Sequence, residues 1–158
     1  KNDISKYKNL NGAIDFSRSQ ALNSVGDTIK EAFCYGQYLE SNKGDPEIML
    51  LLNFKERVSL TGFSIDPINP DSSPKEVILF SGKNNLDFSD IDNLTPTEKL
   101  TLKDGKLVSL KLAKYKNIDS LTIFLKNSDC ESLRLDNLVL YGEGGSNIDM
   151  SQMKNVSA

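Results

Sequence analysis

Apolar residues recur along the second half of the chain in short runs separated by turn-forming residues. Residues 48–54 and 58–65 are two strand-length runs, and the charged triplet "KER" between them predicts a turn. Residues 76–80 are a third run, preceded by "DPINPDSSP", whose prolines cannot continue a paired strand. Several short strands without a sustained helical period predict an all-β fold, either an antiparallel sandwich or a barrel.

Residues 98–102 and 107–112 flank Asp104-Gly105, a dipeptide that tolerates the positive φ of a tight turn. These two runs are therefore predicted to form a hairpin, whose register the pattern leaves open between a two-residue turn and a bulged or longer one. Residues 1–47 mix polar and apolar positions without a clear period, and we expect this region to wrap the core in mostly irregular structure.

The last two runs, 120–125 and 133–141, differ in regularity. In the first, the leucines and isoleucine at 121, 123 and 125 share one face, which is the period of a strand. In the second, the leucines at 133 and 135 have the opposite parity to those at 138 and 140. Because side chains alternate along a strand, the inward face must change near Asp136-Asn137, where we predict a bulge or a bend.

Composition narrows the function classes. The 158 residues fit a single domain, and a net charge of -3 with a pI of about 5.0 gives no general attraction to nucleic acid or anionic lipid. We therefore expect neither a nucleic-acid nor a membrane partner. Lys111, Lys114 and Lys116 form a local basic cluster that is interpreted as a solvated surface. The two cysteines, Cys34 and Cys130, are expected to be free thiols.

Candidate chemistry is sparse. The chain contains no histidine, so Ser-His-Asp and Cys-His arrangements are impossible, and no glycine-rich phosphate loop occurs. We predict no catalytic, metal-binding or cofactor-binding residues. The acidic residues of "DFSDID" loosely resemble a calcium loop, but they lack its glycine and closing glutamate. We interpret Asp87 and Asp90 as turn-capping residues of a solvated loop, in a segment that is helix-like or turn-like.

Two other patterns leave alternatives open. Glu40, Asp45 and Glu47 are carboxylates that a hydrolase could use in pairs, although sequence spacing does not give their separation in space. Aromatic residues could form a platform for sugar stacking, but core packing accounts better for most of them. They are Tyr35, Tyr38, Phe63, Phe80, Phe88 and Tyr141. From these residues the chain is predicted to be a binding module rather than an enzyme.

Several segments, taken in order, resemble the PITH domain, the proteasome-interacting C-terminal module of thioredoxin-like proteins. "ALNS" at 21–24 is similar to the opening of that family, and "YLESNKGDPEIMLLLNF" to its acidic segment and first long strand. "PKEVILF", then "LDFSDID" with "PTEKLTL", are similar to its middle strands and loop. "YKNIDSLTIFLKN" and "LDNLVLYGE" resemble its closing strands, and "NIDMSQMK" resembles its end.

The resemblance implies an antiparallel β-sandwich of jelly-roll type, like galactose-binding domains. It also implies a non-catalytic module that associates with the proteasome regulatory particle in the cytoplasm and nucleus. We expect the chain to be a monomer. A glycan-binding jelly-roll module is the alternative, on analogy of fold. Thioredoxin-fused members of the family carry a Cys-x-x-Cys domain upstream, and that motif is absent from this sequence.

Domain boundaries and candidate contact residues complete the prediction. Residues 1–158 are expected to be one domain, with a lead-in at 1–20, a sandwich core at 21–142 and a tail at 143–158. The sequence departs from the family at Ala21 and Ser24, and its acidic segment is diluted by Asn42, Lys43, Gly44 and Pro46. We expect partner contacts in two loop regions, whose residues are Glu40, Ser41, Asp45, Glu47, Asp87, Phe88 and Asp90.

Overall fold

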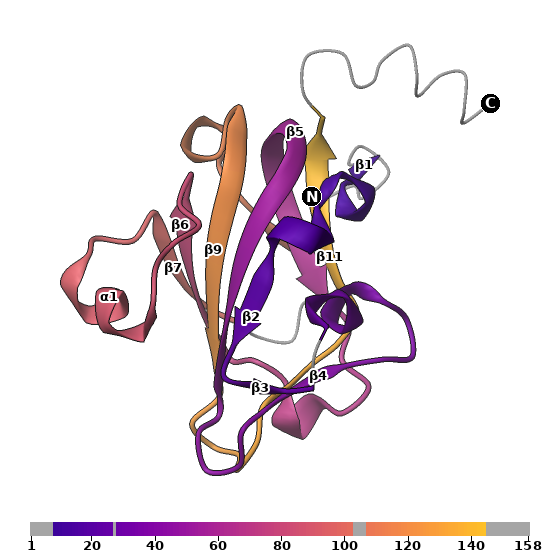
Figure 1. Ribbon diagram of the computed structural model, residues 1–158, viewed down its shortest axis with the longest axis vertical. Coiled ribbons are helices and arrows are strands. Elements are labelled where there is room, and N and C mark those ends of the chain that lie inside the picture. The colour runs from indigo at the N-terminus through magenta and orange to yellow at the C-terminus, as the bar shows by residue number, and fades with distance from the viewer. Residues whose placement is uncertain (1–7, 27, 103–106, 145–158) are drawn as a thin grey trace.

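One long strand, β5 (Glu47–Ile65), connects the two layers of the computed structural model, which describes residues 8–26, 28–102 and 107–144 (Figure 1). Its first half pairs with β9, and its second half pairs with β11. The predicted turn at "KER" is wrong, because the strand runs through it. Phe54 and Val58 both stay buried, so the charged residues between them bulge into solvent where the pairing with β9 shifts register.

The first half of β5 belongs to an antiparallel layer in which β9 lies between β5 and β6. Strand β7 pairs with the other side of β6, and β2 pairs with the other side of β5. The strands of this layer other than β5 are β2 (Gln20–Leu22), β6 (Glu76–Ser81), β7 (Glu98–Thr101) and β9 (Ile118–Lys126). The predicted runs at 76–80 and 120–125 are confirmed, each extended by one to three residues.

The second half of β5 belongs to a layer with β11 on one side and β8 on the other. Its other strands are β1 (Lys8–Asn9), β8 (Leu107–Ser109) and β11 (Leu138–Glu143). The predicted hairpin is wrong, since β7 pairs with β6 whereas β8 pairs with β5. Asp104-Gly105 itself lies outside the described residues.

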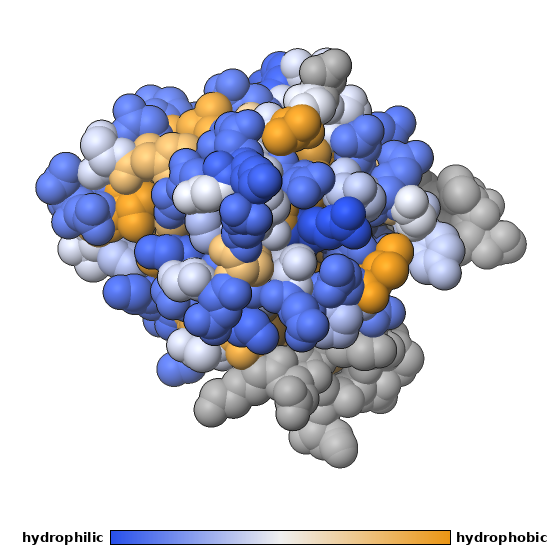
Figure 2. All heavy atoms as spheres, turned by 90° about the horizontal axis from the view of Figure 1, so that it is seen from below, coloured by the Kyte–Doolittle hydropathy of each residue, from blue (hydrophilic) through white to orange (hydrophobic). Residues whose placement is uncertain are grey.

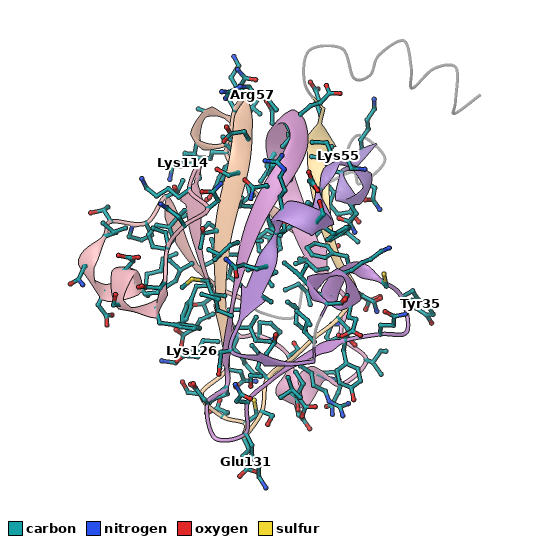
Figure 3. All side chains as sticks on the ribbon, in the orientation of Figure 1. Tyr35, Lys55, Arg57, Lys114, Lys126 and Glu131 are labelled. Carbon is teal, nitrogen blue, oxygen red and sulfur yellow. The ribbon has the colours of Figure 1, made fainter. Side chains whose placement is uncertain are left out.

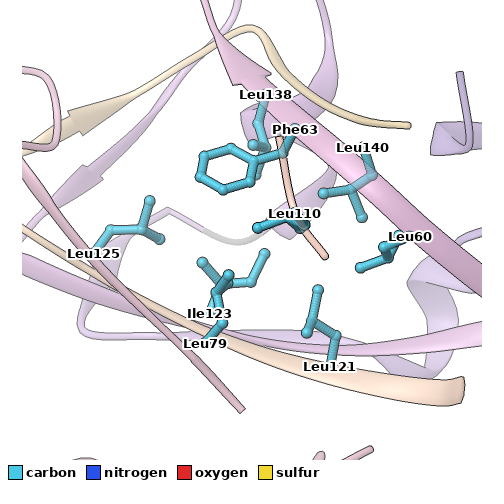
Figure 4. Close-up of a pocket in the computed structure, with 9 residues that line it drawn as sticks. All are labelled: Leu60, Phe63, Leu79, Leu110, Leu121, Ile123, Leu125, Leu138 and Leu140. Carbon is cyan, nitrogen blue, oxygen red and sulfur yellow. The ribbon is translucent and has the colours of Figure 1, made fainter. Parts of the chain in front are cut away.

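The core lies between the two layers. Figure 4 shows Leu60, Phe63, Leu138 and Leu140 from one layer facing Leu79, Leu121, Ile123 and Leu125 from the other. The facing side chains, together with Leu110, line a cavity of about 10 Å³ without a polar wall. A cavity this small and apolar is expected to stay dry. The predicted shared face of residues 121, 123 and 125 is confirmed.

A second, smaller cluster covers the outer face of the β9 layer. It consists of Met49, Leu51, Ile78, Phe80, Leu86 and Phe124, which have the opposite parity along their strands or precede the helix. Helix α1 (Phe88–Asn93) packs Phe88 and Ile91 against this cluster. Because both faces of the layer are covered, the sequences of β5, β6 and β9 are nearly continuous apolar runs and do not alternate between apolar and polar residues.

A third, small sheet closes one end of the sandwich. Its order is β10-β4-β3, with β3 (Ser24–Val25), β4 (Leu39–Ser41) and β10 (Arg134–Leu135). The predicted break at Asp136-Asn137 is confirmed: β10 ends before it, β11 begins after it, and Asn137 has a φ of 53°. The change of inward parity therefore marks the passage of the chain from the small sheet to the main sandwich.

The region before β5 contributes more to the core than the sequence predicts. Leu10, Ile14, Ile29, Ala32 and Leu39 are all buried in the main cluster. These residues lie in or beside short strands and 3-10 helices that have no apolar period of their own. The hydrophobic pattern therefore did not predict that they are buried. The 3-10 helices of the described chain are η2 (Asn11–Ala13), η3 (Phe16–Arg18), η4 (Ile29–Phe33), η5 (Pro70–Ser72) and η6 (Leu112–Lys114). Within the described residues, no helix has the length and apolarity to cross a membrane.

Candidate interaction surface

The end of the sandwich that carries β3, β4 and β10 presents aromatic and charged side chains together. We define the β4 surface as Val25, Glu31, Tyr35, Gln37, Tyr38, Glu40 and Arg134. Figure 2 views the molecule from this end and shows hydrophobic side chains as separate patches among hydrophilic ones. Tyrosine and arginine are enriched at the surfaces through which proteins bind one another.

Tyr38 and Arg134 form the most ordered pair of this surface. The guanidinium carbon of Arg134 lies 4.2 Å from the centre of the Tyr38 ring, which is cation–π geometry. Its Nη2 donates a hydrogen bond of 3.3 Å to the Tyr38 hydroxyl. Arg134 is also the ladder partner of Glu40, so strand pairing holds the three residues together.

Two open hollows adjoin at Glu40. One, of about 360 Å³, is lined by Val25, Glu31, Gln37, Tyr38 and Glu40. The other, of about 420 Å³, is lined by Glu40, Lys43, Asn69, Ser72, Glu131, Ser132 and Arg134. Both are shallow and charged, with acidic side chains alone in the first and charges of both signs in the second. This suits contact with side chains of a partner better than enclosure of a small molecule.

Tyr35 lies on the turn that leads into β4 and is the most exposed of the large hydrophobic side chains described, at 88%. The turn is closed by a hydrogen bond of 3.1 Å from the Gln37 amide to the Cys34 carbonyl, and Gly36 supplies its positive φ of 84°. Figure 3 shows Tyr35 pointing away from the sandwich. Its ring is therefore free to meet a partner.

Ser41, one of the predicted contacts, has a structural role, and as a partner contact it stays a prediction. It is buried, its Oγ accepts a hydrogen bond of 2.8 Å from the Leu133 amide, and its own amide donates to the Leu133 carbonyl at 2.9 Å. These bonds attach β4 to the segment before β10. Glu40, its neighbour, points outward and lines both hollows.

Asp45 and Glu47 are brought together at the start of β5, apart from the hollows. Burial, and then the neighbouring Asp45 carboxyl, raise the pKa of Glu47. Asp92 of α1 adds a smaller repulsion, so this site also lies near the helix. Glu40 lines the two hollows whereas Asp45 and Glu47 line neither of them, so Glu40 is separated from the other two carboxylates.

Asp87 and Asp90 cap α1, as the sequence predicts. The Asp87 carboxylate accepts a hydrogen bond of 3.1 Å from the Ser89 amide, and Asp90 accepts one of 2.9 Å from the Asp87 amide. The hydrogen bond from the Ser89 hydroxyl lowers the pKa of Asp87. Phe88 packs edge-on against Phe124, with ring centres 5.9 Å apart. As a partner contact, this region stays a prediction, and Figure 1 shows α1 at the left of the molecule and β4 at its lower end.

The pattern of the sequence did not reveal two residues that organise this end. Asn23, with a φ of 67°, donates from Nδ2 to the carbonyls of Asp45 (3.0 Å) and Glu47 (2.6 Å) and so fixes the loop before β5. Arg134 stands between buried leucines and carries no motif, and its stacking on Tyr38 depends on tertiary pairing alone. In the part of the chain that the structure describes, no group of acidic, cysteine or histidine residues could hold a metal ion.

Some of the aromatic residues lie in the core and others lie on the surface, the two alternatives that the sequence left open. Phe63 and Phe80 are buried, which confirms core packing for them. Tyr35 and Tyr38 instead face solvent on the β4 surface, with the second only partly exposed. Cys34 and Cys130 are free, and burial raises the pKa of the Cys130 thiol.

Comparison with known proteins gives one family and one fold. A family model described as the PITH domain matches residues 1–158. Among solved structures, the CBM32-1 and CBM32-2 domains of ZmpB from Clostridium perfringens, in complex with GalNAc, superpose with a TM-score of 0.63 at 14% identity. The match covers 89% of this chain and 37% of that chain, so the chain spans little more than a third of its length.

Two further structures agree. The family 32 CBM of NanJ from Clostridium perfringens, in complex with galactose, has a TM-score of 0.58 at 11% identity and is covered over 91% of its length by 78% of this chain. A GH29 fucosidase from Ruminococcus gnavus, in complex with fucose, has a TM-score of 0.60 at 11% identity, with coverages of 87% of this chain and 27% of that chain. At these identities the similarity shows the fold alone, and it confirms the predicted jelly-roll sandwich of galactose-binding type.

Proposed function

Because the chain belongs to the PITH domain family, we propose that it is a non-catalytic interaction module that associates with the proteasome regulatory particle. The family match over all 158 residues is the observation that carries this proposal. Within it, the module acts as a monomer in the cytoplasm and nucleus, and the β4 surface makes the contact.

The composition of the β4 surface supports this assignment. Tyrosine and arginine are the residue types that most often dominate binding energy at protein interfaces. Tyr38 and Arg134 are already ordered by their stacking and by strand pairing, so they would lose little conformational entropy on binding. Tyr35 and Val25 add exposed apolar area beside them, at 88% and 56% exposure.

The charges on this surface favour a partner with basic residues near its contact. Glu31 and Glu40 line one hollow with Tyr38, and Glu131 adds a third carboxylate to the other. Lys43 and Arg134 offset part of this charge in the second hollow only. Complementary charges at such a rim mainly raise the association rate and select the partner.

Affinity for purified regulatory particle, measured by biolayer interferometry, tests the proposal. Tyr35→Ala should weaken binding by at least about tenfold, since truncation of an exposed aromatic anchor removes about 1.4 kcal/mol or more. Leu94→Ala is the matched comparison, because Leu94 is also an exposed hydrophobic residue and follows α1, outside the β4 surface. Absence of binding by the unmodified chain, or weakening by Leu94→Ala alone, would overturn the proposal in this form.

The alternative, a glycan-binding module, is favoured by the shared fold and by the open ring of Tyr35. One face of the Tyr38 ring already carries the Arg134 guanidinium, so that ring offers a sugar less stacking area. Isothermal titration with galactose and GalNAc distinguishes the two functions. Saturable heat that Tyr35→Ala abolishes would establish the alternative.

A further inference from the structure

A basic surface lies at the end of the sandwich opposite the β4 surface. We define the η6 patch as Arg57, Lys111, Leu112, Lys114 and Lys116, all of which are exposed. Figure 3 shows Arg57 and Lys114 near one end of the molecule and Glu131 at the other. Only the three lysines are neighbours in the sequence, and Arg57 joins them because β5 runs through "KER" without turning.

The backbone beneath this patch is firmly held. The Leu60 amide donates to the Tyr115 carbonyl at 3.1 Å, and the Asn117 amide donates to the Ser59 hydroxyl at 2.9 Å. Tyr115 is fully buried, and its hydroxyl donates to the Glu98 carboxylate at 2.7 Å. Because Tyr115 points inward between Lys114 and Lys116, both lysines project from a fixed backbone into solvent.

Arg57 connects the two halves of the patch. Its Nη1 donates to the Asn117 carbonyl at 3.0 Å, which places the guanidinium beside the lysine-bearing segment. Acidic side chains at this end include Glu56, its chain neighbour, Glu143, the ladder partner of Ser59, and Asp119, whose Oδ2 lies 4.0 Å from Arg57 Nη2. The lysine-bearing segment, residues 111–116, contains no acidic residue. The patch is therefore locally positive on a chain whose net charge is -3.

We propose that the η6 patch docks an acidic protein segment that carries a leucine-like side chain. The cations supply long-range attraction, and Leu112, 45% exposed among them, supplies an apolar contact that a purely ionic partner would not use. Nucleic acid and anionic lipid fit less well, since a handful of cations on a negatively charged protein gives little counterion release. With the β4 surface at the opposite end, the module can join two partners.

Fluorescence anisotropy with a labelled peptide rich in aspartate and glutamate and bearing two leucines tests this docking. Lys114→Glu with Lys116→Glu should weaken binding by at least about tenfold. Lys75→Glu with Lys99→Glu is the matched control, because it gives the same net charge from exposed lysines outside the patch. Leu112→Ser should weaken binding of the peptide that carries leucines. It should leave unchanged the binding of an analogue that carries serines in place of those leucines.

Equal weakening by both double variants would overturn the proposal, because it would show that total charge alone decides binding. So would a Leu112→Ser variant that affects both peptides alike. Tighter binding to phosphatidylserine vesicles or to single-stranded RNA than to the peptide would assign the patch to another class of partner. Tyr35→Ala should leave peptide binding unchanged, so this test can fail or succeed independently of the proposed contact at the β4 surface.

Discussion

The interior between the layers and the β4 surface are constructed in different ways. The interior takes most of its side chains from four strands, β5, β6, β9 and β11, and these side chains are almost completely buried. The β4 surface takes its residues from β3, η4, the turn before β4, β4 and β10, short segments from distant parts of the chain, and they remain exposed or half-buried. The interior also lacks polar lining, whereas the surface combines carboxylates, tyrosines and an arginine.

This difference separates stability from binding. Burial of apolar area supplies most of the free energy of folding, and it is concentrated between the layers. Exposed tyrosines and charges contribute little to stability but can contribute much to an interface. Variants between the layers should therefore change the free energy of unfolding, and variants on the β4 surface should change the affinity for the partner.

The largest expected effect on stability is in the interior. Leu125 is fully buried and lies on β9 between β5 and β6, so Leu125→Ala should lower the free energy of unfolding by about 2–5 kcal/mol. Tyr35→Ala, at an exposed position, should change it by about 0.5 kcal/mol or less. Urea denaturation of both variants makes the comparison. Similar losses in the two would show that stability is not concentrated between the layers.

An intermediate effect is expected where the two regions meet. Asn23→Ala removes the hydrogen bonds to the carbonyls of Asp45 and Glu47 and should cost about 1–2 kcal/mol. Asn23→Gly is the matched variant, since glycine tolerates the positive φ but also lacks the amide. Urea midpoints for both should fall below the unmodified chain. Full recovery with glycine would mean that backbone conformation, rather than hydrogen bonding, is the role of Asn23.

The smallest effect is a pH dependence at Asp136. Burial raises the pKa of this carboxyl, although its Oδ2 accepts a hydrogen bond of 3.1 Å from the Ile68 amide. The folded state thus binds the proton more readily than the unfolded state, and the stability contributed by this group rises as the pH falls through its raised pKa.

Asp136→Asn removes the charge and keeps an acceptor oxygen. Its stability relative to the unmodified chain should therefore be greatest near neutral pH and should decline as the pH falls, when Asp136 itself becomes neutral. Urea midpoints over a series of pH values measure this difference. A difference that does not change with pH would contradict the assigned role of burial.

The strands were predictable from the sequence where the buried side chains recur at every second position. Leu121, Ile123 and Leu125 alternate with residues of the other face, and the parity change at Asp136-Asn137 marks a real break. "KER" was misread because a bulge and a turn both expose charged residues, and only the partner strand distinguishes them. The hairpin was misread because chain neighbours in a sandwich can join different layers.

The candidate site was less predictable. Glu40 was identified as a contact residue and lines both hollows, whereas its neighbour Ser41 was predicted with it and is buried. Arg134 gave no signal, because its stacking on Tyr38 joins β10 to the segment before β4 across most of the chain. Surface sites formed by several distant segments have no period or spacing that a single sequence can display.

Hydrogen exchange of the chain, alone and bound to purified proteasome regulatory particle, tests whether the β4 surface makes the contact. We expect slower exchange on binding in the turn of Tyr35 and along β4 and β10, with no change at α1 or between the layers. Slower exchange confined to α1, or no change anywhere in a saturated complex, would contradict the assignment of binding to the β4 surface.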